Sequence, residues 1–228
     1  MHLILGVKRE VVGSKGKSLS FIAPALPLQE LKSEVWARDD YTCAYCGFRS
    51  KKYQEIDYKN GNSFDNSLSN LITTCIYCHQ SLNLDIVAKM RSGTLVWLPE
   101  LSQIELHHLV RAIYIARVAQ GDIADAARLA LDALLARKDD AKRILGTDDP
   151  ALLSFILQDF LEDKLYSKRE HKLEGIRLLP LDKRIIKDGD LEFNQFPQIL
   201  AYWKSKDGPY GDFSAEQWLE KFTSLKVL

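Results

Sequence analysis

Two short Cys-x-x-Cys segments constrain this chain more than any other feature of its sequence. They contain all of its cysteines, Cys43 and Cys46 in the first segment and Cys75 and Cys78 in the second, with 28 residues between the segments. Structural Zn²⁺ sites favour four soft ligands in a tetrahedron, and two such segments supply four thiolates. Two disulfides or four buried free cysteines are the alternatives. The spacing predicts a zinc site, which would stabilise the fold without implying any chemistry.

The N-terminal sequence lacks the features of a secretory signal. The apolar stretch Leu3–Val7 is too short for one, and charged residues follow it immediately. No run of the sequence approaches the ~18 apolar residues that a membrane-spanning helix needs. We therefore expect a cytosolic protein. Thiols stay reduced in that compartment, which favours metal binding over disulfides for the paired cysteines.

Charge is evenly balanced along the chain. The 228 residues include 31 Lys and Arg against 31 Asp and Glu, and 46% of residues are hydrophobic, which excludes a wholly disordered protein. Residues 36–98, which contain the cysteines, hold seven basic and six acidic residues. Domains that bind nucleic acid usually carry a clear basic excess. The charge balance therefore argues against a DNA-binding groove.

The pattern of apolar residues, turn residues and caps predicts an α+β protein. The expected elements are a strand or hairpin within residues 1–30 (runs 3–7 and 19–22), a short helix over 29–37, a strand over 94–98, helices over 102–120, 122–145 and 150–164, a short helix over 198–204 in an otherwise irregular segment 175–212, and a helix after a Ser214–Gln217 capping box. The expected organisation is an N-terminal hairpin plus zinc module over residues 1–98, a helical part packed on it over 99–185, and a C-terminal tail with one or two short helices over 186–228.

The residues between and after the cysteine pairs follow a recognisable order. The first pair is followed by Asp57-Tyr58, an asparagine-rich loop and Asn70-Leu71, and the second pair ends in His79. Over residues 36–90 this order resembles the HNH nuclease motif. The resemblance implies a ββα-metal zinc module of the treble-clef type.

The sequence departs from the HNH motif at the residue that carries catalysis. In HNH nucleases the second residue of the doublet is a histidine that acts as general base, and here it is Tyr58. Tyrosine has an ordinary pKa of ~10 against ~6.5 for histidine, so it is a poor base at neutral pH. We therefore expect a protein that is not an enzyme. Two alternatives stay open: a metal-dependent HNH endonuclease using Asp57, Asn70 and His79, and a non-catalytic zinc module that binds nucleic acid.

The remaining polar residues of the motif have structural interpretations as well as functional ones. Asp57 and His79 could hold Mg²⁺ or a second zinc ion. Otherwise Asp57 is a carboxylate beside a turn, and His79 is an exposed or hydrogen-bonded side chain near the start of a helix. Asn66 and Asn70 are expected to hold their loop by bonding backbone groups.

Four further segments carry a closer resemblance. They are residues 38–48, 68–75, 93–101 and 176–180. Together these segments resemble the IcmJ (DotN) family of the Dot/Icm type IVB secretion system, over roughly residues 1–185. The resemblance implies an HNH-like zinc fold used as a scaffold rather than a nuclease. It also implies a subunit of the cytoplasmic coupling complex, peripheral to the inner membrane, that binds the C-terminal extension of the coupling ATPase for effector recruitment.

Aromatic residues gather near the end of the chain, at Tyr202, Trp203, Tyr210 and Trp218. Aromatic residues are enriched at interface hot spots. They also anchor chain ends onto the body of a protein, and the sequence leaves both interpretations open.

Overall fold

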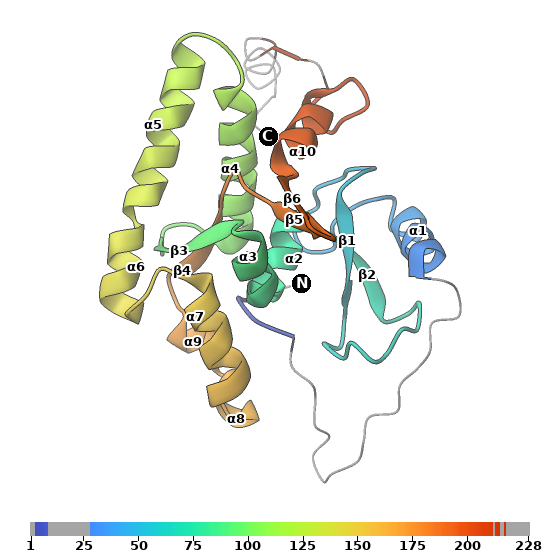
Figure 1. The fold of residues 1–228 in the computed structure, drawn as a ribbon, viewed down its shortest axis with the longest axis vertical. Helices are drawn as coiled ribbons and strands as arrows, with labels where there is room; N and C mark the ends of the chain where they lie inside the picture. The colour runs from blue at the N-terminus through green and yellow to red at the C-terminus, as the bar shows by residue number, and fades with distance from the viewer. Residues whose placement is uncertain (1–2, 9–27, 212, 215–216, 218–228) are drawn as a thin grey trace, which may run out of the picture.

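The computed structural model describes residues 3–8, 28–211, 213–214 and 217. The elements follow the order α1 (Leu28–Arg38), β1 (Gln54–Tyr58), β2 (Leu71–Cys75), α2 (Ile76–Leu82), α3 (Leu84–Met90), β3 (Gly93–Trp97), α4 (Gln103–Arg117), α5 (Asp122–Ala136), α6 (Lys138–Leu145), α7 (Pro150–Phe155), the π-helix η1 (Ile156–Phe160), α8 (Asp163–Tyr166), α9 (Arg169–Lys172), β4 (Ile176–Pro180), β5 (Ile185–Asp188), β6 (Leu191–Asn194) and α10 (Phe196–Lys204) (Figure 1). The predicted run 19–22, Trp218 and the helix face expected after the Ser214–Gln217 capping box lie outside the described residues. Within that box, the Ser214 N–H donates to Gln217 Oε1 and the Gln217 N–H donates to Ser214 Oγ.

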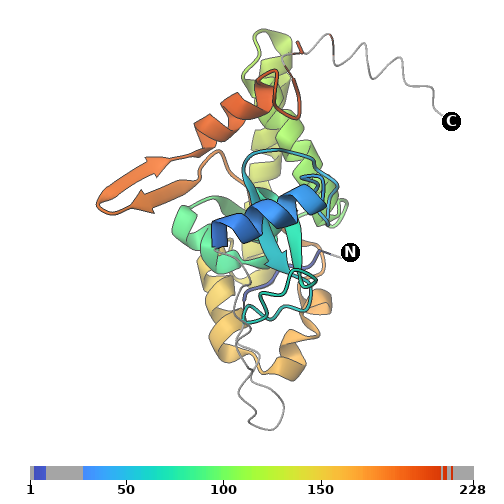
Figure 2. The same ribbon diagram turned by 90° about the vertical axis from the view of Figure 1, so that its right-hand side faces the viewer.

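Helices and small sheets make up the described structure, which confirms the predicted mixed class. The strands form three separate antiparallel pairs, β1 with β2, β3 with β4, and β5 with β6. The hairpin β1–β2 leads directly into α2. In Figure 2 the hairpin β5–β6 projects away from the body of the molecule. Among the described residues, none of the helices combines the length and apolar character needed to cross a bilayer.

Most predicted helices are confirmed, with one break and one change of type. The helix expected over 122–145 is two helices, α5 and α6, which meet at Arg137. The Arg137 carbonyl accepts a hydrogen bond from the Trp97 backbone N–H of β3 (3.2 Å), and the Arg137 side chain bonds the Trp97 carbonyl. The Arg137 carbonyl and side chain therefore both bond strand β3, at the residue where α5 ends and α6 begins. The helix expected over 150–164 begins as α7 and continues as the π-helix η1.

Two predictions about strands are wrong. Residues 3–7 form no strand, although all of them except Ile4 are buried. Gly6 bonds the Ser81 carbonyl and the Leu84 N–H, while Leu5 and Val7 bond the side chains of Arg169 and Tyr166, so these backbone groups do not pair with a strand of the described residues. The segment 175–212, expected to be irregular apart from one helix, contains β4, β5 and β6. The partner of β4 is β3, about eighty residues earlier in the chain. The helix expected over 198–204 is confirmed as α10.

The largest core cluster surrounds the cysteines and includes side chains from both ends of the chain. Cys43, Cys75 and Cys78 pack in it together with Leu106 of α4 and Trp203 of α10. The Trp203 ring contacts Phe48, Tyr77, Phe196 and Tyr210, each in T-shaped geometry. These contacts agree with the second interpretation of the aromatic cluster, in which it anchors the end of the chain: Trp203 packs α10 against the segment that carries the cysteines.

Candidate metal centre

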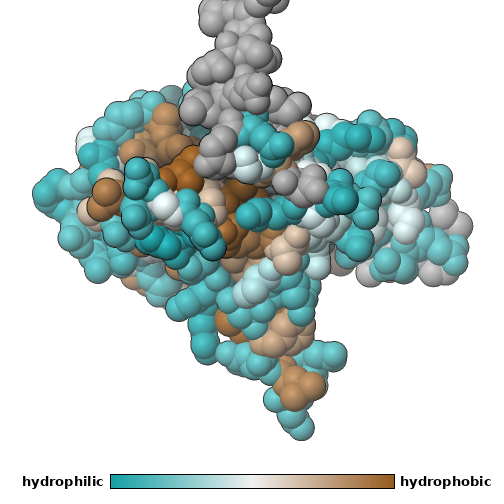
Figure 3. Space-filling view, turned by 90° about the horizontal axis from the view of Figure 1, so that it is seen from above, coloured by the Kyte–Doolittle hydropathy of each residue, from teal (hydrophilic) through white to brown (hydrophobic). Residues whose placement is uncertain are grey.

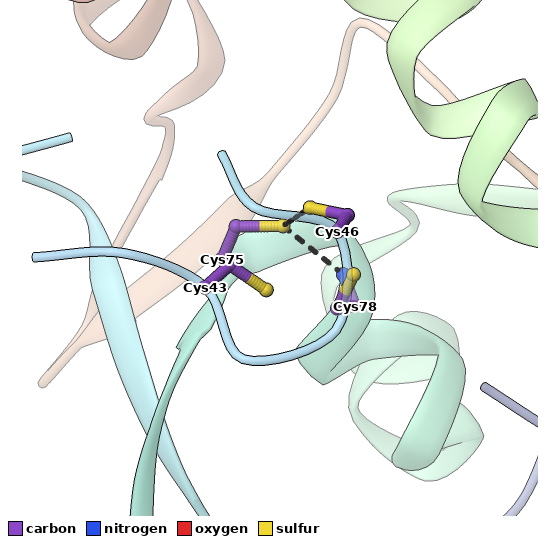
Figure 4. Close-up of side chains that lie close together, drawn as sticks. All are labelled: Cys43, Cys46, Cys75 and Cys78. Atoms are coloured by element: carbon purple, nitrogen blue, oxygen red, sulfur yellow. Dashed lines mark hydrogen bonds between the residues drawn. The ribbon is translucent and has the colours of Figure 1, made fainter. Parts of the chain in front are cut away.

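The two cysteine pairs sit on two different kinds of local structure. Cys43 and Cys46 lie in a tight turn, closed by hydrogen bonds from the Cys43 N–H to the Phe48 carbonyl and from the Gly47 N–H to the Cys43 carbonyl. Gly47 has a φ of +70°, a conformation that glycine adopts without strain. Cys75 ends β2 and caps α2, because its sulfur accepts the Cys78 backbone N–H at 3.4 Å. Figure 4 shows the turn and the helix start placing their four sulfurs side by side.

The four sulfur atoms have the spacing of a metal site. All lie within 4.8 Å of one another, and Cys46 Sγ is 3.6 Å from Cys75 Sγ. Tetrahedral bonds of 2.3 Å place sulfurs about 3.8 Å apart, whereas a disulfide joins them at about 2.05 Å. The cysteines are therefore free thiols arranged to hold a metal ion. Within the described residues, they are the only such group of three or more His, Cys, Asp or Glu side chains.

Burial makes ionisation of the Cys75 thiol costly. Burial, followed by hydrogen bonds from Cys43 and Cys46, raises the pKa of the Cys75 thiol well above its ordinary value. Metal ligation requires thiolates, and a bound cation supplies the charge that stabilises them. The donor set of four sulfurs fits a soft or borderline ion such as Zn²⁺ better than Mg²⁺ or Ca²⁺, which bind oxygen.

Helix α4 contributes two further residues to the centre, and sequence reasoning missed both. Arg111 is fully buried, and its Nη2 donates to Cys75 Sγ at 2.8 Å. His107 lies one turn earlier, with Nδ1 3.5 Å from Cys78 Sγ. The available signal was two polar residues four positions apart on the apolar face of α4, beside Leu106 and Val110.

Both α4 side chains are shifted in pKa by this environment. Burial, with a smaller contribution from Arg111, lowers the pKa of His107 to about 3, so its imidazole is neutral at physiological pH. Burial alone would lower the pKa of Arg111, but the charges of Cys75 and Cys46 outweigh it and raise that pKa above its ordinary value. Arg111 is therefore a permanent cation beside the sulfurs.

Comparison with known proteins identifies the family. No family model matches the chain. It is 32% identical, over 155 residues, to the type 4 apparatus protein DotN of Legionella pneumophila subsp. pneumophila, an alignment that covers 65% of this chain and 71% of the relative. The chain belongs to the DotN family. This confirms the family predicted from the four sequence segments.

In this DotN-family chain, Asp57 and His79 form a closed pair beside the metal centre. Asp57 Oδ2 lies 2.7 Å from His79 Nδ1, and both side chains are buried. Asn83 donates to Asp57 Oδ1, and Lys8 Nζ lies 4.0 Å from the same oxygen. Asp57 is thus the fourth of the five residues of β1, two residues before the next turn, and its carboxylate is buried and paired. His79 is hydrogen-bonded, as one interpretation expected, but it is not exposed.

The remaining motif residues organise the loop between β1 and β2. Asn70 accepts the Asn60 backbone N–H and donates to the Asp65 carbonyl, which confirms its predicted role in holding backbone groups. Tyr58 donates its hydroxyl to Asn66 Oδ1 at 3.2 Å. Burial, with a smaller contribution from the Asp57 charge, raises the pKa of Tyr58 above its ordinary value. At neutral pH even less of Tyr58 is ionised than of an exposed tyrosine, so Tyr58 is a poor candidate for a general base.

Proposed function

We propose that this DotN-family chain is a non-catalytic, zinc-stabilised adaptor of a Dot/Icm type IV secretion coupling complex. In this proposal it binds the C-terminal region of the coupling ATPase and other subunits of the complex for effector recruitment, on the cytoplasmic side of the inner membrane. The observation that carries the proposal is its relationship to the type 4 apparatus protein DotN. The metal centre then has a structural role: it joins the β1–β2 hairpin, α2 and α4 into one unit.

The zinc module of this proposal is HNH-like. Support comes from the order of the elements around the cysteines: the first pair in a turn, then the β1–β2 hairpin, then α2 with the second pair at its start. Asp57 on β1 and His79 on α2 occupy neighbouring positions on the two elements. Such a module becomes a scaffold once its base is lost and its remaining polar residues bond one another.

The absence of nuclease activity is the first expected result. With Mg²⁺, Mn²⁺ or Ni²⁺, the purified chain should nick supercoiled plasmid no faster than its Asp57→Ala and His79→Ala variants. The physical reason is that Tyr58 has a raised pKa and Asp57 is held by His79, Asn83 and Lys8. Asp65→Ala is the matched control, because it removes a carboxylate that lies in the loop before β2, outside the Asp57–His79 pair. Nicking that survives in Asp65→Ala but disappears in both other variants would establish the endonuclease alternative.

The structure exposes apolar side chains that a protein partner can cover. Leu152, Phe155, Ile156 and Phe160 are all exposed on α7 and η1, and the two phenylalanine rings contact each other in T-shaped geometry. At the opposite end of the molecule in Figure 1, Val118 at the end of α4 and Ile123 at the start of α5 are exposed. Figure 3 looks onto that end and shows hydrophobic residues gathered near its middle, surrounded by hydrophilic ones.

Binding to the ATPase tail is the second expected result. The full chain should co-purify with the C-terminal region of its cognate coupling ATPase, and a Phe155→Ser/Phe160→Ser variant should bind at least about tenfold more weakly, because exposed aromatic pairs are typical interface anchors. Leu129→Ser, which changes a residue 71% exposed on α5, is the control. Val118→Ser/Ile123→Ser tests the other surface. Failure of the unaltered chain to bind the tail would overturn the proposed function. Binding lost only in Val118→Ser/Ile123→Ser would move the interface to the α4–α5 end.

A further inference from the structure

Arg111 is an unusual cation because no carboxylate of the described residues accompanies it. Its side chain is 0% exposed, and the groups whose charges act on it are cysteines and tyrosines, with no Asp or Glu among them. Its Nε and Nη1 atoms are buried without a hydrogen-bond partner. A buried charge that lacks a counter-charge is strongly destabilising. The chain therefore retains Arg111 against a considerable cost, which requires a compensating interaction.

The surroundings of Arg111 point to the metal centre. Its Nη2 lies 2.8 Å from Cys75 Sγ and 3.6 Å from Cys46 Sγ. The guanidinium carbon lies 4.1 Å from the centre of the Phe48 ring and 5.0 Å from that of Tyr77. The rings favour a cation but carry no net charge. The cysteine sulfurs are thus the groups in contact with Arg111 that can carry the opposite charge.

Formal charges make this pairing quantitative. One divalent ion bound by four thiolates carries a net charge of about −2, all of it within a buried cluster. A single guanidinium halves that charge. Arg111 and the metal centre therefore reduce each other's penalty, since a buried cation and a buried anion are each costly alone.

His107 supplies a neutral donor to the same centre, and the hydrogen bonds of Gln103 fix its tautomer. Gln103 Oε1 accepts the Leu178 N–H at 2.9 Å, and its Nε2 donates to the Leu178 carbonyl at 2.7 Å, which sets the orientation of the amide. The same Nε2 lies 2.8 Å from His107 Nε2, which must then accept. The proton of the neutral ring is on Nδ1, directed at Cys78 Sγ.

We propose that Arg111 and His107 are outer-sphere positioning residues of the metal centre, with Arg111 as its counter-ion. Together they donate to three of the four sulfurs, Cys46, Cys75 and Cys78, from a single helix. Docking of α4 and metal affinity are then linked, because each supplies the charge or the donor that the other lacks. The inference rests on the proposed metal centre and is independent of the secretion partner.

Metal affinity of matched arginine variants tests the inference. Zinc affinity of the full chain is measured by competition with a chromophoric chelator at fixed pH, for the unaltered chain, Arg111→Met, Arg111→Lys and Arg117→Met. Arg111→Met should bind zinc at least about tenfold more weakly, as expected for loss of an outer-sphere partner, with Arg111→Lys in between. Arg117→Met is the control, because Arg117 lies on the same helix but pairs with Asp182 at the surface.

A second readout uses the unaltered chain and so does not depend on the folding of a variant. The protein is loaded with an NMR-active cadmium isotope, and scalar couplings are sought from the metal through sulfur to the side-chain protons of Arg111 and His107. Such couplings are expected only if those protons donate to ligand sulfurs. If Arg111→Met leaves the zinc affinity unchanged, or if the cadmium-loaded protein shows neither coupling, the proposed role of Arg111 and His107 is wrong while the metal centre stands. An unaltered chain that binds no metal overturns the metal centre and this inference together.

Discussion

Cys78→Ser is expected to abolish metal binding and to destabilise the whole protein. Bound zinc should fall from about one ion per chain to far less, and the midpoint of thermal unfolding should drop by more than about 10 °C. Structural zinc contributes about 10–16 kcal/mol in small zinc-binding peptides, which is comparable to the entire net stability of a typical domain, about 5–15 kcal/mol. Cys78 is fully buried in the largest core cluster, so the loss reaches α4 and α10 as well as the turn.

Metal analysis and circular dichroism on the purified variant measure both effects. Thr42→Ser is the matched control, because it alters a partly exposed side chain directly before Cys43 and leaves all four sulfurs in place. The same loss of stability should follow when a chelator removes zinc from the unaltered chain, and added zinc should reverse it. A Cys78→Ser protein with one tightly bound zinc and an unchanged unfolding midpoint would contradict the four-cysteine centre.

The four cysteines of the candidate centre were predictable because the members of each pair are close in sequence. Two cysteines separated by two residues can meet one ion from a single turn or helix start, whatever the rest of the chain does. Arg111 and His107 were not predictable in the same way. They reach the sulfurs from a helix that begins after the second pair, and its docking is set by tertiary packing. From sequence alone they are two polar residues in an amphipathic pattern.

The same distinction, between features that are local in sequence and features that depend on tertiary packing, explains which helices and strands were predicted. Helices such as α1, α4 and α10 follow from apolar periodicity and caps within one segment, as in the capping box formed by Ser102 and Glu105. Strand β4 is five residues long and depends on β3 for its hydrogen bonds, so its own sequence carries little signal. The hairpin β5–β6 did carry one: Gly189 has a φ of +58° at the first position of a two-residue turn, which fits type II′. The hairpin was not predicted because Gly189 is one of several glycines and prolines in 175–212 that together indicate an irregular segment.

Trp203→Ala is expected to cost about 3–5 kcal/mol of unfolding free energy, the range for truncating a buried aromatic side chain. Trp203 is 1% exposed, and its ring contacts Phe48 and Tyr77, which lie beside metal ligands in both cysteine segments. The resulting cavity should loosen the two segments relative to each other. Zinc should therefore transfer to a chelator faster from this variant than from the unaltered chain, although no metal ligand has changed.

Two further variants separate packing at Trp203 from general sensitivity to lost aromatic residues. Phe160→Ala removes a ring that is 67% exposed and should cost less than about 1 kcal/mol. Trp203→Phe keeps a ring in the cavity and removes an indole N–H that is buried without a partner among the described residues, so its cost should be well below that of Trp203→Ala. Chemical denaturation measures all three. Equal losses for Trp203→Ala and Phe160→Ala, with zinc transfer unaffected, would mean that α10 lies on the metal centre without stabilising it. The expected ranking instead makes α10 part of the same folding unit as the four cysteines.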